Sequence, residues 1–264
     1  MMCFGPRAYS QNPATQAAVG TSDKQPLSLG LSISQNSNLK QRSDDEYDAY
    51  TDVLAIPTYS FSRVDVSAWL GMSKSWVDEQ KFLIQDSRVE IVGKSVDLGA
   101  GFKFGYPVFL ALPTSKASRK EKSLQASVGA RPTINFDFAK IGFRNLKMFY
   151  GLSVSKNVHK YSTATDGSSN NEWGISNIVG AGLTLSKKLE LAATFFQRNN
   201  FTYLGYLRQS FRHDERLSYA LNDTISLGVG HTNEGSALKP NGEDTSSVFD
   251  RNNSEVYFSL NASF

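Results

Sequence analysis

The chain has 264 residues, of which 40% are hydrophobic, and its formal net charge is +3. This length allows one large β domain or two small ones. The small net charge argues against a dedicated nucleic-acid-binding protein. The sequence contains no run of about 18 apolar residues, so it predicts no transmembrane helix. The single cysteine, Cys3, excludes intrachain disulfides and cysteine-rich zinc sites, and three histidines offer little material for metal or acid–base chemistry.

Residues 1–25 form a polar leader. Within it, Ala8-Tyr9-Ser10 before Gln11 resembles the small-x-small end of a secretory signal, although no long apolar stretch precedes it. Two interpretations stay open: the remnant of a signal whose apolar part lies before residue 1, and a disordered leader without a function. We expect one folded domain over residues 26–264.

From residue 26 onward, apolar and polar residues alternate with a period of two. The stretch "PLSLGLSIS" places Leu27, Leu29, Leu31 and Ile33 on one face and serine or glycine on the other. The same pattern recurs, in chain order, over residues 95–108, 123–138, 146–154, 177–185, 225–230 and 254–264. A period of two is typical of β-strands, and helical periodicity is nearly absent, so the sequence predicts an all-β fold.

The second face of these strands is unusual for a surface in water. It carries mainly glycine and serine with scattered charges, whereas a solvated strand face usually avoids glycine, which weakens strands. Such a face suits the crowded or water-filled inside of a barrel, with the apolar face turned to lipid. We therefore predict a transmembrane antiparallel up-and-down β-barrel. Tyr59, Tyr106, Tyr150 and Tyr219 are candidates for its aromatic interface girdles.

The connections give the strand count. Short turns are predicted near 62–63, 93–94, 139–142, 186–188 and 222–223, and they alternate with six long polar loops, one of which covers residues 198–209. This arrangement predicts twelve strands with both chain ends on the short-turn side, as in bacterial outer-membrane barrels. Ten or fourteen strands stay open, because residues 78–92 and 189–221 fit the pattern least well.

The last strand, "SEVYFSLNASF", places Val256, Phe258, Leu260 and Phe264 on its apolar face. An alternating strand that ends in phenylalanine resembles the signal by which the barrel-assembly machinery recognises outer-membrane proteins of Gram-negative bacteria. The chain is similar to a broad class, the twelve-stranded outer-membrane channels and translocator barrels, and to no single family within it. The resemblance implies a location in the bacterial outer membrane, with the lipid bilayer, lipopolysaccharide and the assembly machinery as partners.

The sequence contains none of the common hydrolase, phosphate-binding or metalloprotease motifs. Outer-membrane phospholipases and lipid A deacylases resemble one another in carrying a histidine and a serine two residues apart, and none of the three histidines of this chain has a serine at that spacing. We therefore expect neither catalysis nor a cofactor or metal. The loop residues Lys116, Arg119, Lys120 and Lys122 are either a contact for the phosphates of lipopolysaccharide or simply a solvated loop.

Charged residues on the predicted inner face are the candidate functional site. Two interpretations stay open: a pore whose transverse field selects small polar or anionic solutes, and a set of salt bridges that fills a narrow lumen. The candidates are Asp97, Lys103, Arg131, Asp137, Lys147 and Glu190, with Arg63, Asp65, Arg208 and Arg216 as weaker additions.

The leading hypothesis is a monomeric outer-membrane barrel that acts as a passive channel for small hydrophilic solutes. The first alternative is a closed structural or surface-interaction barrel, plugged by its own side chains and residues 11–25, that presents its loops to partners. The second is the translocator barrel of an autotransporter, which is weakened because no passenger domain precedes it in the sequence.

Overall fold

The structure, a computed structural model, describes residues 26–41, 45–77, 80–143, 145–237, 249–250 and 253–264. The two interpretations of residues 1–25 and the plug formed by residues 11–25 therefore lie outside the described residues.

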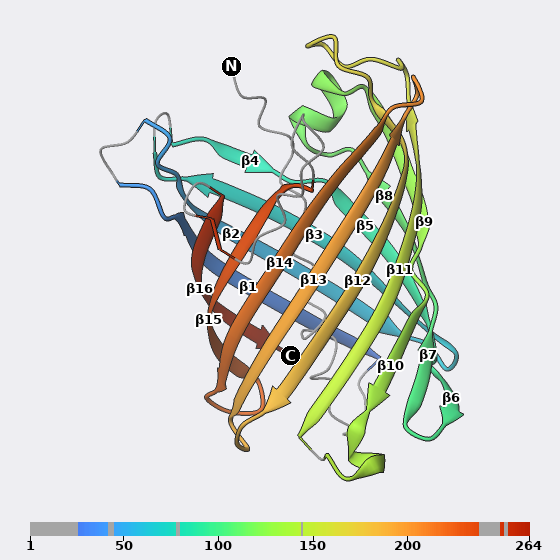
Figure 1. The fold of residues 1–264 in the computed structure, drawn as a ribbon, viewed down its shortest axis with the longest axis vertical. Coiled ribbons are helices and arrows are strands. Elements are labelled where there is room, and N and C mark those ends of the chain that lie inside the picture. The colour runs from blue at the N-terminus through green and yellow to red at the C-terminus, as the bar shows by residue number, and fades with distance from the viewer. Residues whose placement is uncertain (1–25, 42–44, 78–79, 144, 238–248, 251–252) are drawn as a thin grey trace.

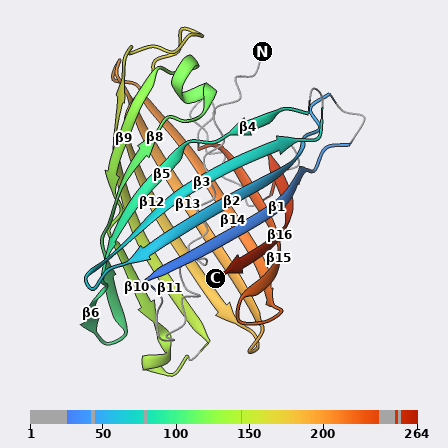
Figure 2. The ribbon, with the colours of Figure 1, turned by 180° about the vertical axis from the view of Figure 1, so that it is seen from behind.

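A single antiparallel sheet closes on itself to form the wall of a barrel (Figures 1 and 2). Each wall strand pairs with the wall strands before and after it in the chain, and the last pairs with the first. This confirms the predicted fold class and the count of twelve wall strands. The wall consists of β1 (Leu27–Asn38), β2 (Ala49–Ser60), β3 (Val64–Ser75), β5 (Ser87–Gly93), β8 (Pro107–Leu112), β9 (Leu124–Ala130), β11 (Leu146–His159), β12 (Asn171–Thr184), β13 (Leu189–Thr202), β14 (Leu207–Ala220), β15 (Ile225–Ser236) and β16 (Ser254–Ser263).

The seam between β1 and β16 removes the free edges of the sheet. Gly30 pairs with Ser263 and Asn38 with Glu255, and the ladder continues past β16 through two backbone hydrogen bonds between Leu29 and Phe264, at 2.9 and 3.0 Å. A closed ladder satisfies the backbone polar groups of the wall without water, which is the condition for a sheet in hydrocarbon.

Four further strands lie outside the twelve-stranded wall: β4 (Phe82–Ile84), β6 (Val96–Gly99), β7 (Phe102–Gly105) and β10 (Thr133–Asp137). The prediction of one continuous strand over residues 95–108 is therefore wrong. Gly99, Ala100 and Gly101 all have positive φ angles (83°, 50° and 89°), a conformation that glycine adopts readily, and they reverse the chain between β6 and β7. The resulting hairpin extends from the lower end of the barrel in Figure 1.

The predicted strand over residues 123–138 is also divided. Both parts pair with β11: β9 pairs with its second half and β10 with its first half. Arg131 and Pro132 separate them, and Pro132 has no backbone N–H to donate to a ladder. Arg131 therefore lies at the junction between β9 and β10.

The prediction of a long loop over residues 198–209 is wrong as well. β13 continues to Thr202, β14 begins at Leu207, and only residues 203–206 connect them. The polar residues that suggested a loop pair across the two strands: Asn199 faces Gln209, whose Nε2 donates a 2.8 Å hydrogen bond to Asn199 Oδ1.

The apolar residues of the wall point outward. Leu70, Val108, Val128, Leu191 and Val229 are all exposed, although the same residue types would be buried in a water-soluble sandwich. Tyr59, Tyr106, Tyr150 and Tyr219 share this outer face and are similarly exposed. No helix in the described part of the chain is long and apolar enough to cross a membrane. The outer surface therefore matches lipid along the strands, as predicted from the alternation.

Three glycines of the inner face make room for aromatic rings from neighbouring strands. An added Cβ would lie 1.9 Å from the ring of Phe149 at Gly180, 2.4 Å from Phe109 at Gly129 and 2.3 Å from Tyr257 at Gly230. Residues that pair directly across a sheet point to the same face, so each ring covers its glycine inside the barrel. This explains the presence of glycine at these three positions of the second face.

The two ends of the barrel differ. One end, which we call the short-turn end, carries the connections after β2, β12 and β14, the β6–β7 hairpin, and a 3₁₀ turn, η3 (Phe138–Ile141). The other, the long-loop end, carries β4 and a short π-helix, η2 (Ala117–Glu121), at the upper end of Figure 1. The predicted basic loop forms this π-helix and its flanks.

Candidate functional site: the charged lumen

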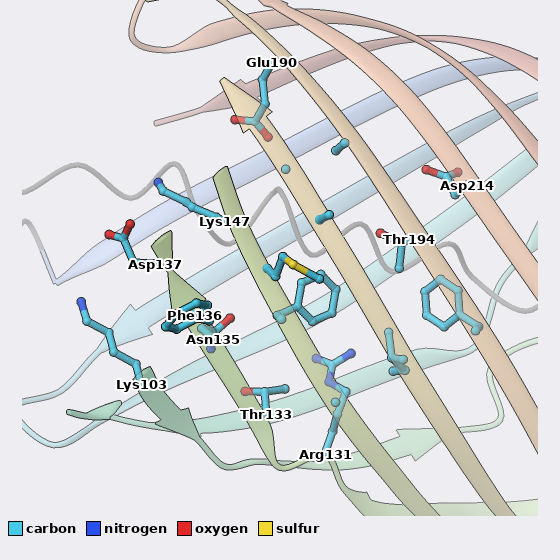
Figure 3. A pocket seen from close by; sticks show the side chains of 18 of the residues that line it. Lys103, Arg131, Thr133, Asn135, Phe136, Asp137, Lys147, Glu190, Thr194 and Asp214 are labelled. Carbon is cyan, nitrogen blue, oxygen red and sulfur yellow. The ribbon is translucent and has the colours of Figure 1, made fainter. Parts of the chain in front are cut away.

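A cavity of about 510 Å³ lies inside the barrel. Strands from both sides of the wall line it, and Figure 3 shows charged and polar side chains that point into it. Its lining includes Trp69, Lys103, Arg131, Thr133, Asn135, Asp137, Lys147, Ile178, Glu190, Thr194, Phe196 and Asp214.

Five of the six predicted pore residues line this cavity: Lys103, Arg131, Asp137, Lys147 and Glu190. The sixth, Asp97, is not part of the lining. It is exposed on β6, and its carboxylate accepts a 2.8 Å hydrogen bond from the backbone N–H of Gly99, so it shapes the β6–β7 turn. The roles of all six residues in permeation stay predictions.

Four of these residues form what we call the vestibule, near the short-turn end: Lys103, Asp137, Lys147 and Glu190. Lys147 pairs directly with Asp137 across β10 and β11, and Lys103 comes from β7 on the other side of β10. Among the described residues, none of the four takes part in an ion pair within 4.0 Å. The four charges therefore do not neutralise one another in ion pairs, unlike the filled salt-bridge network of the alternative interpretation.

A tighter charge cluster lies on the wall formed by β5 and the β9–β10 junction. Glu90 is completely buried and forms ion pairs with both Arg88 and Arg131, the second at 2.9 Å. The guanidinium of Arg88 also lies 4.7 Å from the ring centre of Phe109 and 5.2 Å from that of Trp69, within the range of cation–π contacts. One carboxylate thus holds two arginines in place against the lumen.

A second cluster faces it from β13–β16. Glu234 forms ion pairs with Arg198 at 3.6 Å and with Arg212 at 3.4 Å, and the hydroxyl of Tyr257 donates a 3.1 Å hydrogen bond to Asp214. Arg216, on the same inner face of β14, is also buried.

These two clusters belong to opposite walls of one lumen. β14 is six strands from β5 in both directions around the barrel, and Arg131 and Asp214 line the same cavity. We call the two clusters together the arginine girdle: Arg88, Glu90, Arg131, Arg198, Arg212, Asp214, Arg216, Glu234 and Tyr257. With five arginines and three carboxylates it carries an excess of two positive charges, whereas the vestibule is balanced.

Most residues of the arginine girdle were not predicted from the sequence. Arg88 and Glu90 lie in the segment 78–92, and Arg198, Arg212 and Asp214 in 189–221, the two stretches whose strand register the alternation left open. Arg216 was among the weaker candidates. One sequence signal could have identified part of the girdle: Arg212, Asp214 and Arg216 alternate along one strand face. This alternation is recognisable only after residues 207–220 have been assigned to a strand.

The residues proposed as an assembly signal lie on the outer face of the closing strand. Val256, Phe258 and Leu260 on β16 and Phe264 just after it are all exposed. Their recognition by an assembly machinery stays a prediction.

Only the comparison of three-dimensional structures, and not the comparison of sequences, relates this chain to known proteins. No family model and no curated protein matches the sequence. Among solved structures, an outer membrane channel from Pseudomonas putida F1 aligns with a TM-score of 0.60 at 9% identity, over 93% of this chain and 100% of the other. The NanC porin aligns with a TM-score of 0.57 at 10% identity over 89% and 98%, and the KdgM porin with 0.50 at 9% over 89% and 99%. The chain therefore has the fold of outer-membrane porins and channels.

Proposed function

We propose that this protein is a passive channel of the bacterial outer membrane for small hydrophilic solutes, with a preference for anions. The observation that carries the proposal is the cavity lined by the vestibule, Arg131 and Asp214, with other girdle residues bonded directly to Arg131 and Asp214. The girdle's excess of two positive charges inside a low-dielectric wall attracts anions and repels cations. The outward apolar belt and the similarity in fold to porins and channels support the location and the transport class.

The arrangement suggests a simple mechanism. A solute that enters from the short-turn end first meets separated lysines and carboxylates, which can replace part of its hydration by transient contacts. At the girdle, guanidinium groups held by Glu90 and Glu234 present hydrogen-bond donors in fixed positions, a geometry that suits carboxylate and phosphate groups. No step requires a cofactor, because the solute crosses by diffusion down its gradient.

The test is the reversal potential across a planar bilayer with a salt gradient. Wild-type protein, refolded in detergent and inserted, is expected to conduct in discrete steps and to favour chloride over potassium. The double variant Lys103→Glu/Lys147→Glu is expected to shift the reversal potential toward cation selectivity, because it turns the balanced vestibule negative.

Lys74→Glu/Lys156→Glu is the matched control. It makes the same change in total charge on outward-facing positions, since Lys74 pairs with Thr51 and Lys156 with Trp173 on the outer face, and it is expected to leave the reversal potential unchanged. Inserted wild-type protein that does not conduct would overturn the channel proposal in favour of a closed barrel. Equal shifts of the reversal potential in both double variants would show that the vestibule does not lie on the conduction path.

A further inference from the structure

The outer wall of the barrel carries a group of polar residues within its apolar belt. His213 and Glu215 alternate along β14, and His231 of β15 pairs directly with Glu215. They lie on the lipid-facing side, because Leu217 and Val229, the next pair toward the short-turn end, are exposed there. Two imidazoles and a carboxylate in such a place are costly unless something satisfies their polar atoms.

The three side chains converge. His231 Nδ1 lies 2.9 Å from one carboxylate oxygen of Glu215, and His213 Nδ1 lies 3.2 Å from the other. The two imidazole ring centres are 5.5 Å apart, and one ligand atom from each of the three residues lies within 4.8 Å of the other two. An ion bound at about 2.0–2.2 Å to nitrogen and oxygen ligands in tetrahedral geometry separates those ligands by roughly 3.4 Å, so small side-chain adjustments would bring all three onto one ion.

His213 provides an independent observation. The residue is 7% exposed, and its 3.2 Å contact with Glu215 does not meet the geometry of a hydrogen bond, so neither ring nitrogen has a hydrogen-bond partner among the described residues. Nε2 of His231 is likewise buried without one. Buried polar side-chain atoms are usually hydrogen-bonded, and buried ring nitrogens without a partner beside the Glu215 carboxylate indicate a ligand.

We propose that His213, Glu215 and His231 form a binding site for a divalent transition metal ion, of which zinc is the best match. Imidazole suits zinc, copper and nickel, and a carboxylate completes a three-residue set that leaves the fourth tetrahedral position to water. A hollow of about 380 Å³ adjoins the site, with His213, Glu215 and the small residues Ala181 and Ala193 in its lining. The bound ion joins β14 to β15 and stabilises this part of the wall.

The sequence contains a signal for the site. A turn centred on residue 223 places residue 231 opposite residue 215, so the pattern His-x-Glu followed by a histidine at this distance brings three ligands to one face of a hairpin. The expectation that three histidines offer little material for metal chemistry rested on their small number, and it did not include the pairing of β14 with β15.

The experiment titrates zinc and cobalt into the refolded protein, purified with a tag that contains no histidine. Wild-type protein is expected to bind one equivalent, to give the visible absorption of tetrahedral cobalt, and to unfold at a higher temperature with zinc. His213→Gln, Glu215→Gln and His231→Gln are each expected to weaken binding by more than the roughly 10–100-fold that is lost when a residue hydrogen-bonded to a metal ligand is removed.

His159→Gln is the matched control. His159 lies on β11 against Tyr203, away from the site, and its replacement should leave affinity and spectrum unchanged. Circular dichroism and the electrophoretic shift on boiling show which variants have folded, and Glu215→Gln keeps nearly the same shape. Absence of stoichiometric binding in the wild type would overturn the proposal, and so would affinity that survives in the folded Glu215 and His231 variants.

Discussion

Glu90 shows how much of the lumen depends on a single side chain. Its carboxylate forms ion pairs with both Arg88 and Arg131, and it is completely buried. Removing one partner of a buried ion pair leaves an uncompensated charge, which costs much more than the pair itself contributes.

We predict that Glu90→Gln lowers the free energy of unfolding by about 3–5 kcal/mol, because two arginines lose their shared counter-charge. Urea unfolding in lipid vesicles, followed by tryptophan fluorescence, measures the change. Asp65→Asn is the control, since its ion pair with Lys94 is exposed at the short-turn end and should contribute only about 0–1 kcal/mol. Equal effects of the two substitutions would show that water reaches Glu90 freely.

At the scale of the strands, the cross-strand pairs of glycine and aromatic residues set the packing of the inner face. Gly230 is the tightest case for the girdle, because an added Cβ would meet the ring of Tyr257 at 2.3 Å and the backbone oxygen of Glu215 at 2.7 Å. The backbone oxygen cannot move without disturbing the β14–β15 ladder, and a displaced Tyr257 loses its hydrogen bond to Asp214.

We therefore expect Gly230→Ala to destabilise the barrel by about 1–3 kcal/mol, the usual cost of overpacking. Gly182→Ala is the matched control: a Cβ there would approach only Glu190 Oε1, at 3.7 Å. Both changes add one methyl group to an inner strand face, so a comparison of their urea midpoints isolates the clash. Similar midpoints would mean that the wall adapts at Gly230.

The strands also show which parts of the fold could be predicted from sequence. A period of two does not depend on distant contacts, so the alternation identified the strand type and the lipid-facing side, and the order of short turns and long loops indicated the twelve wall strands. It could not detect the reversal at residues 99–101, because β6 and β7 continue the same alternation after a turn in space. Nor could it assign Asn199 and Asn200 to strands, because their polarity is typical of loops and only pairing with β14 satisfies them. The girdle and the histidine cluster depend on register between strands, which the alternation alone leaves open.

The whole molecule is a closed ladder without a free strand edge among the wall strands, and unfolding has to open it at some seam. We predict that the folded protein resists detergent until boiled, so that unheated and boiled samples migrate differently on a gel, because the closed wall is kinetically stable. Far-ultraviolet circular dichroism of the unheated sample should show β structure. A helical or random spectrum would contradict the barrel.

Adjacent residues on β10, which helps to line the cavity, test most directly whether the lumen is the path of the solute. Asn135 points into the cavity, as Figure 3 shows, whereas Ile134 is exposed on the outer face. After replacement of Cys3 by serine, single-channel conductance would be recorded for Asn135→Cys and Ile134→Cys before and after a negatively charged, water-soluble thiol reagent. We predict a clear stepwise change in conductance for Asn135→Cys and none for Ile134→Cys. A change confined to Ile134→Cys, or none at Asn135→Cys in channels shown to be modified, would contradict a conducting lumen.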